Sequence, residues 1–553
     1  MSDEIPSKCT VLVIGGGPAG SYTASVLARE GINTVLLEAD KFPRYHIGES
    51  GLPSLRHYLR FIDLDEKFRG HGFTKKCGAA FKVTPGNREA YTDFVAAGGP
   101  EGYTWNMIRS EADEMLFRHA GKSGAKIFDG VRVTEVQFDP VDATTALAAT
   151  TTTNGDDRSA GTDFQFRRPV SASYVRKGDV EDSAGEKSTP GVAGTITFDY
   201  LVDATGRAGI LSTRYLKSRR YTKALKNVAH WAYYRNAGKY ARGTPRENSP
   251  FFEALNDESG WVWFIPLHDG TTSVGVVRRY DIATTKKTTA GSTDAYYTES
   301  LKAAPIISAF IAETGAAERV TPVRSASDFS YTSPTYTLPH ARIVGDAGCF
   351  IDPLFSSGLH LALTGGLSAA TTIAASLRGD VEEEVAGRWH SAKIAQGYAR
   401  FLLVVLSAYK QMWNQHKFVL HEDGEGHFDR AFDIFRPVIQ GEADTCKSEL
   451  TQSELSTSMN PLLTTLDSRL PNLLGDEEAM DKAIGTTGEG QDERRQEVEI
   501  LTAMLSGHGL ELLTMGDYTT DIIEGRVPRL ERGKLTLVFA GEKEGEKECS
   551  AWM

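Results

Sequence analysis

Two groups of residues in this 553-residue chain point to chemistry: a glycine-rich turn near the N-terminus and a pair of tryptophans far downstream. The run Gly15-Gly16-Gly17-Pro18-Ala19-Gly20 directly follows a short apolar segment, as a dinucleotide-binding turn does. In such a turn Gly15 permits the bend, Gly17 lets the backbone approach a pyrophosphate and Gly20 lets the helix approach the strand. The run Trp261-Val262-Trp263-Phe264-Ile265-Pro266 alternates indoles with other apolar side chains, as a strand does.

The segments around the glycine turn predict a complete β-α-β unit. Residues 9–14 form a continuous apolar run typical of a buried parallel strand, and residues 34–37 predict a second strand. Pro18 opens the helix between them, and its N-terminus directs a positive dipole end at the phosphates. Glu38 stands where the acid that binds ribose hydroxyls is expected.

Three later motifs resemble the flavin contacts of the large FAD-dependent monooxygenase superfamily, and they favour FAD over NAD. They are Asp203-Ala204-Thr205-Gly206-Arg207, Arg342-Ile343-Val344-Gly345-Asp346-Ala347, and Asn106-Met107-Ile108-Arg109 followed by Ala112-Asp113. The resemblance implies that Asp346 binds the ribityl or ribose part of FAD and that Arg109 contacts the cofactor.

The remaining pattern predicts an α/β fold in three parts. Strands are expected at 131–138 and 195–202, a hairpin at 260–267 and 272–278, and helices from about residue 359, including 381–413 and 498–515. The Thr- and Gly-rich segments 150–157 and 177–191 suggest a surface insertion, and 484–492 a loop. We assign residues 1–80, 105–215 and 331–380 to a discontinuous Rossmann-like FAD-binding domain. An inserted antiparallel-sheet substrate domain takes 81–104 and 216–330, and a helical C-terminal region takes 381–553.

Four segments narrow the resemblance to flavin-dependent halogenases, closest to the fungal enzymes that act on phenolic polyketides. They are Ile47-Gly48-Glu49-Ser50 with Leu52-Pro53-Ser54, Cys77-Gly78-Ala79-Ala80-Phe81-Lys82, the tryptophan motif, and Phe350-Ile351-Asp352-Pro353-Leu354-Phe355-Ser356-Ser357-Gly358. The Phe81-Lys82 pair implies that Lys82 is the catalytic lysine. We read Lys75 and Lys76, the rival candidates, as facing solvent.

The resemblance implies chlorination of an electron-rich phenolic ring of a polyketide-type natural product. A separate NAD(P)H-dependent reductase supplies FADH2, and O2 gives a flavin C4a-hydroperoxide that chloride, or competing bromide, attacks. Lys82 then presents electrophilic chlorine from hypochlorous acid, which requires an amine that burial can hold neutral. Ser357 and Gly358 supply backbone N–H groups for the halide, and Trp261, Trp263, Ile265 and Pro266 keep the organic substrate from the flavin.

The resemblance assigns further residues to the cofactor. They are Gly15, Gly17, Ala19, Gly20, Glu38, Gly48, Glu49, Ser50, Arg109, Asp203, Gly206, Gly345, Asp346, Pro353 and Gly358. One position departs from the tryptophan-specific enzymes, which carry a glutamate where this chain has Phe355. That departure favours a phenol, free or carrier-bound, over tryptophan. His360 is more typical of a packed residue than of a base.

Composition excludes several other classes. The net charge of -12 argues against nonspecific nucleic-acid binding, and the longest apolar run, residues 401–408, is too short to span a membrane. Five scattered cysteines without zinc spacing suit reduced thiols in the cytoplasm, and they predict no metal site. Two alternatives stay open: an aromatic hydroxylase of the same superfamily, and a non-catalytic flavin-binding partner protein.

Overall fold

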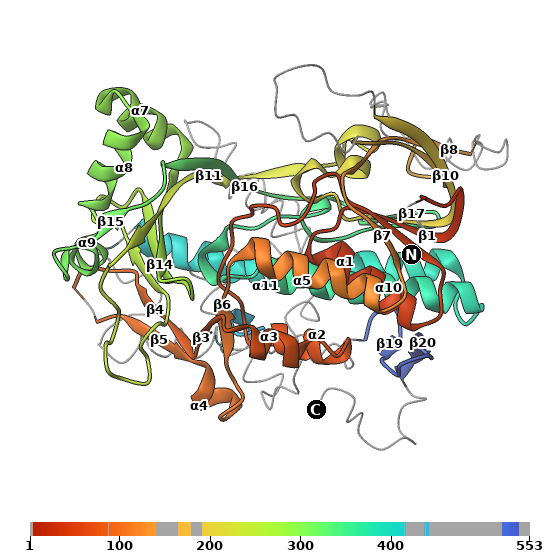
Figure 1. Ribbon diagram of the computed structural model, residues 1–553, viewed down its shortest axis with the longest axis horizontal. Helices are drawn as coiled ribbons and strands as arrows, with labels where there is room; N and C mark the ends of the chain where they lie inside the picture. The colour runs from red at the N-terminus through yellow and green to blue at the C-terminus, as the bar shows by residue number, and fades with distance from the viewer. Residues whose placement is uncertain are drawn as a thin grey trace, which may run out of the picture.

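The computed structural model describes residues 4–86, 88–139, 164–177, 191–413, 415, 436, 438–441 and 522–540. Within these ranges, two eight-stranded sheets lie toward opposite ends of the molecule, and long helices run between them (Figure 1). The expected loop at 484–492 and the expected helix at 498–515 lie outside the described residues, as does most of the surface insertion.

The first sheet has the strand order β17-β18-β10-β1-β2-β7, and β8 and β9 extend it beside β10. Strands β18, β10, β1, β2 and β7 run parallel, so their carboxyl ends meet at one edge. The strands are β1 Lys8–Ile14, β2 Thr34–Leu37, β7 Lys126–Phe128, β8 Val131–Phe138, β9 Pro169–Arg176, β10 Val192–Asp203, β17 Thr337–Leu338 and β18 Ala341–Ile343.

The strands predicted for this sheet are confirmed. Val11, Leu12 and Val13 are each fully buried, which explains why β1 is apolar without alternation: helices and neighbouring elements cover both faces of a parallel sheet. Helix α1, Pro18–Arg29, packs between α5, Arg109–Lys122, and α10, Gly358–Arg378. The sheet and these helices form the predicted Rossmann-like layer.

The second sheet has the order β15-β11-β14-β13-β12-β4-β5, with β16 beside β11. The pairs are antiparallel except that of β4 with β12. The strands are β4 Gly78–Lys82, β5 Ala90–Asp93, β11 Arg220–Arg235, β12 Phe251–Ala254, β13 Gly260–Pro266, β14 Thr271–Arg279, β15 Glu318–Arg319 and β16 Arg324–Thr332. The predicted tryptophan hairpin is thus β13–β14.

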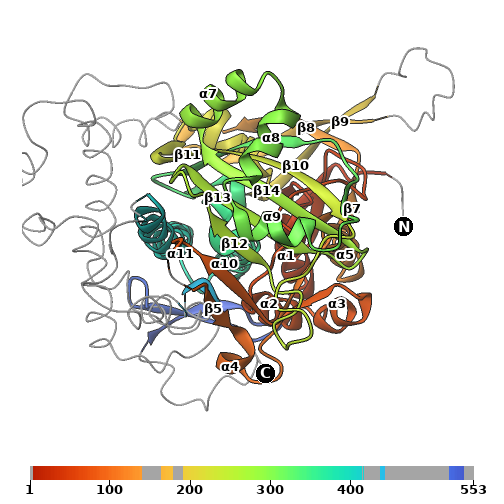
Figure 2. The same ribbon diagram turned by 90° about the vertical axis from the view of Figure 1, so that its left-hand side faces the viewer.

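The two faces of the second sheet have different neighbours. Helices α7 Tyr280–Ala290, α8 Thr293–Leu301 and α9 Pro305–Ala312 lie on its outer side (Figure 2). Val262 and Phe264 share an apolar core with residues of α8 and α9 there. Trp261 and Trp263 point the other way, into the core shared with the rest of the molecule. The sheet therefore presents the indoles inward.

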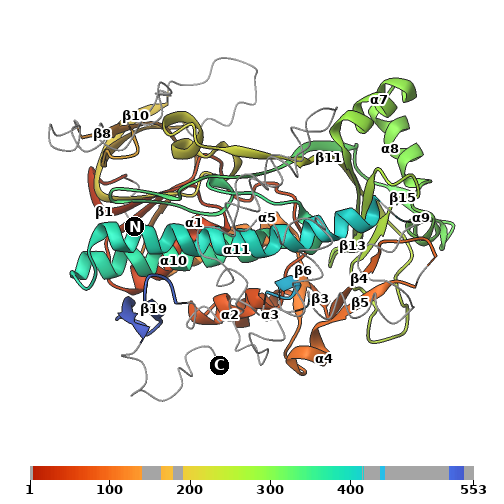
Figure 3. The ribbon, with the colours of Figure 1, turned by 180° about the vertical axis from the view of Figure 1, so that it is seen from behind.

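Two helices lie side by side across the molecule (Figure 3): α10 and α11, Glu383–Met412. Helix α11 has 30 residues, so it is about 45 Å long. Near its N-terminus Glu383 accepts hydrogen bonds from Arg342 of β18, at 2.7 Å and 3.1 Å. Its last turns reach the tryptophan hairpin, where Tyr409 contacts Trp261.

Shorter elements complete the described chain. Two small antiparallel pairs are β3 Thr74–Lys76 with β6 Thr104–Asn106, and β19 Arg526–Arg529 with β20 Thr536–Phe539; the short helices are α2 Ser54–Phe61, α3 Asp65–His71 and α4 Phe94–Gly98. The β19–β20 hairpin lies within residues 381–553, the region for which we expect helices. Hydrophobic residues of β20 pack against α10 there, which a helical pattern does not predict. The boundaries of the three predicted parts stay a prediction.

A search of the described helices for a segment both long and apolar enough to cross a bilayer finds none.

Candidate active site

The glycine turn follows β1, and each predicted glycine is required there for a different steric reason. Gly15 has φ +104°, and a Cβ there would lie 2.2 Å from the carbonyl oxygen of Ala204. A Cβ on Gly20 would lie 1.9 Å from the Gly15 carbonyl oxygen, so α1 could not approach the strand. Beside Gly17 there is room, since the nearest atom to a Cβ would be an Arg44 nitrogen at 3.4 Å. The first turn of α1 is open to a phosphate group.

Glu38 ties the glycine turn to β2. Its buried carboxylate accepts hydrogen bonds from the Gly16 N–H at 2.6 Å and from the Asp40 N–H at 2.9 Å. Arg44 Nε lies 3.9 Å from the same carboxylate. A carboxylate oxygen accepts more than one hydrogen bond, so Glu38 retains capacity for a ribose hydroxyl.

Asp203 ends β10 and shapes the next loop with its side chain. The buried carboxylate accepts hydrogen bonds from Thr205 Oγ1 at 2.7 Å and from the Leu211 N–H at 2.7 Å. Gly206 then has φ +61°, and no atom lies within 4 Å of where its Cβ would be. The structure thus uses Asp203 to position the loop, while the backbone at Gly206 borders open space.

The loop after β18 brings Gly345 and Asp346 to the start of α1. Gly345 has φ +58°, and a Cβ there would lie 3.1 Å from the Cβ of Ala19. Burial raises the pKa of Asp346, while the guanidinium groups of Arg207 and Arg109 oppose that rise. In the part of the chain that the structure describes, no hydrogen bond reaches this carboxylate. An unpaired carboxylate beside a dinucleotide turn fits a ribose or ribityl hydroxyl.

Arg109 begins α5 and holds the loop at 47–54. Its Nη1 donates to the carbonyl oxygens of Ile47 at 3.0 Å and Gly48 at 3.3 Å, and its Nε pairs with Asp113 at 2.8 Å. Gly48 itself has φ +105°. The guanidinium of Arg109 therefore positions the loop that carries Glu49. These contacts occupy much of the guanidinium and leave less of it for direct contact with a cofactor.

The side chain of Glu49 connects this loop to the second sheet. It is 2% exposed, accepts a short hydrogen bond from the Tyr233 hydroxyl, and accepts one from Ser273 Oγ at 3.4 Å. Ser273 Oγ in turn accepts the indole N–H of Trp263 at 3.0 Å. Burial raises the pKa of Glu49, and the Tyr233 hydrogen bond opposes that rise. One tryptophan of the hairpin is thus linked to the loop at 47–54.

Our interpretation of Lys76 as solvent-facing is wrong. Its side chain is 1% exposed, and its Nζ donates to Ser50 Oγ at 2.8 Å and to the Gly51 carbonyl oxygen at 2.8 Å. Burial lowers the pKa of Lys76 to about 7. Its neighbour Lys75 is exposed, as predicted, because side chains alternate along β3. The near-neutral amine that we expected at Lys82 is therefore found at Lys76, beside the loop at 47–54.

Lys82 lies on the outer face of the second sheet. On β4, Phe81 points inward, with its ring centroid 5.2 Å from that of Phe355, so its neighbour Lys82 points to the opposite face. Lys82 is only partly buried, and its Nζ donates to the Pro85 carbonyl oxygen at 3.1 Å. The structure does not bring Lys82 to the face that carries Trp261 and Trp263, because strand alternation separates them.

Trp261 is fixed by a polar cluster that the sequence did not reveal. Its indole N–H donates to the Tyr409 hydroxyl at 2.7 Å, and this hydroxyl donates to Asp352 at 2.6 Å. Asn227 donates to the same Asp352 oxygen at 3.0 Å. Asp352 lies within the motif at 350–358, but nothing in the helical pattern around Tyr409 marks Tyr409 as a contact of the hairpin.

The other predicted gatekeepers follow on β13. The side chain of Ile265 is buried in the shared core. The carbonyl oxygen of Pro266 accepts a hydrogen bond from Asn106 Nδ2 at 3.1 Å, and Asn106 lies at the end of β6. The end of the tryptophan motif is therefore anchored to β6.

The predicted halide residues lie where α10 begins. Ser357 is fully buried, and no hydrogen-bond partner for its Oγ is found among the described residues. Gly358 is exposed, with no atom within 4 Å of where its Cβ would be. Pro353 opens the preceding 3-10 turn, Pro353–Phe355. An unpartnered hydroxyl beside open backbone at a helix N-terminus fits a small anion.

His360, one turn further on, is packed as expected. It is 1% exposed, its Nδ1 lies 2.9 Å from Ser54 Oγ, and its ring lies against Tyr58 and Phe401.

Comparison with known proteins gives a consistent result. The tryptophan halogenase family model matches residues 10–106 and 158–418. The flavin-dependent halogenase ascD of Acremonium egyptiacum is 51% identical over 542 residues, covering 96% of this chain and 93% of that protein. The sulochrin halogenase gedL of Aspergillus terreus is 47% identical over 548 residues, covering 97% and 94%.

A solved structure agrees with these sequence matches. The myxobacterial chondrochloren halogenase CndH superposes with a TM-score of 0.61 at 26% identity, covering 86% of this chain and 99% of that one. The fold, the dinucleotide turn and the extent of the sequence match lead to one assignment: the chain belongs to the tryptophan halogenase family and is an FAD-dependent halogenase, an oxidoreductase.

Proposed function

We propose that this enzyme chlorinates an electron-rich phenolic ring of a polyketide-type natural product, and that Lys76 delivers the chlorine. The observation that carries the proposal is the buried Lys76 amine, 1% exposed and hydrogen-bonded to the loop at 47–54. The sulochrin halogenase relative, named for its substrate, supports the substrate class. Bromide can compete with chloride, since it is easier to oxidise.

The cofactor has a fitting cradle. Gly15, Gly17 and Gly20 keep the start of α1 open to the pyrophosphate, and the unpaired Asp346 carboxylate suits a ribityl or ribose hydroxyl. Reduced FAD supplies the oxidising chemistry that, with O2 and chloride, yields hypochlorous acid. The residues of this chain hold the halide, exclude the organic substrate from the cofactor and transfer chlorine to the substrate.

Lys76 can accept chlorine only as a neutral amine. Because burial lowers its pKa to about 7, a large fraction is neutral at physiological pH. The amine nitrogen then attacks the chlorine of hypochlorous acid: an N–Cl bond forms, the O–Cl bond breaks, and the oxygen leaves as water with an amine proton. The phenolic ring takes the chlorine from nitrogen, and the ring proton returns the amine to its starting form.

The indole rings of Trp261 and Trp263 separate the two reactions. Both side chains are buried, at 1% and 6% exposure, and each is fixed by a hydrogen bond from its indole N–H. A rigid barrier lets the small oxidant through and holds back the aromatic substrate. We propose that this barrier is what prevents direct hydroxylation of the ring.

The absence of an acidic partner at Phe355 supports a phenol. A phenol or phenolate activates its own ring, whereas an indole needs help from a carboxylate near the lysine. Phe355 packs against Phe81 instead, with 5.2 Å between the ring centroids. This position therefore carries an apolar ring in place of a carboxylate.

We also propose a cytosolic enzyme served by a separate NAD(P)H-dependent flavin reductase. Among the described residues Cys9, Cys77 and Cys349 are free thiols, which suits a reducing compartment. The phenolic acceptor reaches the enzyme either free or bound to a carrier.

A matched pair of lysine variants tests the proposal. Lys76→Met and Lys82→Met are combined with a flavin reductase, NADH, FAD, air and chloride, and phenolic polyketides and free tryptophan are screened by mass spectrometry for chlorine isotopes. We expect Lys76→Met to bind FAD and release hypochlorous acid, trapped with monochlorodimedone, without chlorinating the phenol. Lys82→Met should chlorinate normally.

If Lys82→Met lost chlorination of the phenol and Lys76→Met kept it, Lys82 would be the residue that delivers chlorine. Wild-type product that carries added oxygen and no halogen would assign the enzyme to the hydroxylases instead. Chlorinated tryptophan with untouched phenols would reject the substrate class.

A further inference from the structure

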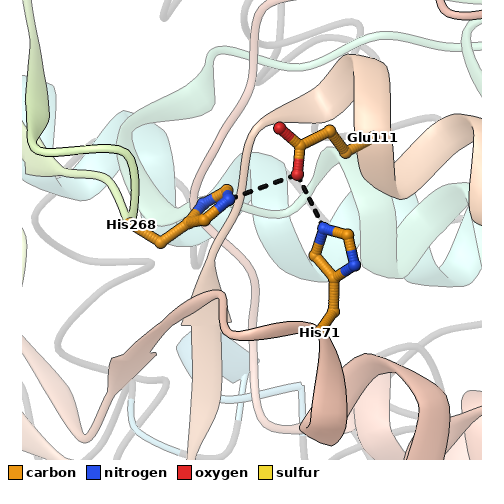
Figure 4. Close-up of side chains that lie close together, drawn as sticks. All are labelled: His71, Glu111 and His268. Carbon is orange, nitrogen blue, oxygen red and sulfur yellow. Dashed lines mark hydrogen bonds and ion pairs between the residues drawn. The ribbon is translucent and has the colours of Figure 1, made fainter.

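A second cluster of titratable side chains lies away from the glycine turn. His71, Glu111 and His268 point toward one another (Figure 4), and one nitrogen or oxygen of each lies within 4.8 Å of the other two. His71 ends α3, Glu111 lies in the first turn of α5, and His268 lies in the turn between β13 and β14. Three separate elements therefore each contribute one potential metal ligand.

The distances from Glu111 to the two imidazole nitrogens can be compared with those of a metal site. Glu111 Oε2 lies 3.2 Å from His268 Nε2 and 2.6 Å from His71 Nε2. Around a tetrahedral Zn²⁺ with bonds of about 2.0–2.1 Å, ligand atoms lie roughly 3.3 Å apart. The Glu111–His268 pair already has this spacing. The His71 side chain must withdraw by about 0.7 Å to reach the same spacing, which its exposed place at the end of α3 permits.

One aromatic ring orients both imidazoles. The ring of Phe73, itself 5% exposed, lies 4.4 Å from that of His71 and 5.3 Å from that of His268 between centroids. This packing limits the positions that the imidazoles can take and so lowers the entropy lost on binding an ion. Two imidazoles and one carboxylate form a donor set that suits Zn²⁺ and its first-row neighbours.

We propose that His71, Glu111 and His268 bind a divalent transition-metal ion of the Zn²⁺ type, with the fourth position left to water. Such an ion joins α3 and α5 to the turn of the tryptophan hairpin. His268 follows Pro266 by two residues, and Glu111 follows Arg109 by two. The ion would therefore hold the gatekeeping hairpin against the helix whose arginine organises the loop at 47–54.

The sequence did not predict this site because its ligands are far apart along the chain. The sequence contains no Cys/His cluster at zinc spacing. Only the contact between the two parts of the fold brings His268 to Glu111.

Titration of the full-length, FAD-loaded, untagged protein with Zn²⁺ after chelator treatment tests the site. We expect one ion per chain by calorimetry and a rise in Tm, and visible absorption typical of low-coordinate Co²⁺ when Co²⁺ replaces Zn²⁺. Glu111→Gln keeps the side-chain shape but removes the anionic ligand, so binding should weaken roughly tenfold or more. Glu114→Gln on the same helix, where Glu114 pairs with Arg118 at 3.3 Å, is the matched control.

Equal Zn²⁺ affinity of the wild type and Glu111→Gln, or no stoichiometric binding by the wild type, would overturn the proposal. A second variant, His268→Gln, and circular dichroism of each protein guard against misfolding as the cause of any loss.

Discussion

Lys76→Met should stabilise the folded enzyme while removing its chlorinating activity. The pKa of Lys76 falls from the usual 10.5 to about 7 because burial disfavours its ammonium form. At about 1.4 kcal/mol per pH unit, that difference means the charged amine costs the folded state roughly 5 kcal/mol at pH 6. Methionine fills similar volume and carries no charge, so this cost disappears in the variant.

Two lost hydrogen bonds offset part of the gain. Lys76 Nζ donates to Ser50 Oγ and to the Gly51 carbonyl oxygen, both at 2.8 Å. Leaving a buried acceptor without a donor costs about 1–3 kcal/mol, although the Ser50 hydroxyl can rotate to another partner. The net expectation at pH 6 is therefore a stabilisation of about 2–4 kcal/mol, which is unusual for a change at a buried site.

The pH dependence gives the sharper test, and its sign follows from the lowered pKa. Between pH 7 and 10.5 the unfolded chain carries a proton on Lys76 that the folded protein lacks, so wild-type stability rises with pH in this window. Lys76→Met lacks this contribution. Its advantage over the wild type should therefore shrink by about 1.4 kcal/mol per pH unit from pH 7 to 9.

Urea unfolding of the wild type, Lys76→Met and Lys82→Met at pH 6, 7, 8 and 9 measures this difference. Because Lys82 lies partly exposed on the outer face of the sheet, its variant should track the wild type. A difference between Lys76→Met and the wild type that stays constant from pH 7 to 9 would refute the reasoning. The reasoning would also be refuted if Lys82→Met differed from the wild type with the same pH dependence as Lys76→Met, because the dependence could then not come from burial of the Lys76 amine.

Two further changes probe the cofactor turn and the indole barrier. Gly20→Ala should give protein purified without flavin absorbance, because the new Cβ would lie 1.9 Å from the Gly15 carbonyl oxygen. Gly70→Ala is the control and should retain FAD, because no atom lies within 4 Å of its Cβ position. Equal flavin content in the two variants would contradict the steric argument. Tyr409→Phe removes the hydroxyl between Trp261 and Asp352. It should therefore lower the free energy of unfolding by about 1–3 kcal/mol and shift the tryptophan fluorescence. If neither quantity changes, Trp261 is held by packing alone.

The parts of this fold that depend on local pattern were predictable. Strands β1, β2 and β8 and the start of α1 follow from apolar runs and from glycine and proline placed where the backbone requires them. The hairpin β13–β14 followed from two runs separated by a short turn. These features are encoded within about ten consecutive residues, so one sequence is enough.

Features that depend on long-range packing were not predictable from the residues alone. Lys76 is buried only because the loop at 47–54 folds over the three-residue strand β3, and Lys82 is turned outward only because β4 joins the second sheet. The Tyr409 contact to Trp261 spans 148 residues. The β19–β20 hairpin depends in the same way on its contact with α10. The resemblance to a motif therefore pointed to residues 77–82, whereas the buried lysine, Lys76, lies one residue before that segment.

Helix α11 fixes the rotation of its first turn relative to its last turn, at the two ends of the enzyme. Glu383 is paired with Arg342 at one end and the Tyr409 hydroxyl with Asp352 at the other, so both ends of one continuous helix are locked in rotation. Each residue of an α-helix turns it by about 100° and advances it by about 1.5 Å. A single inserted residue would thus carry Tyr409 to a different side of the helix and leave Trp261 without its acceptor. Sequence drift in α11 can substitute residues freely at exposed positions but cannot change their number.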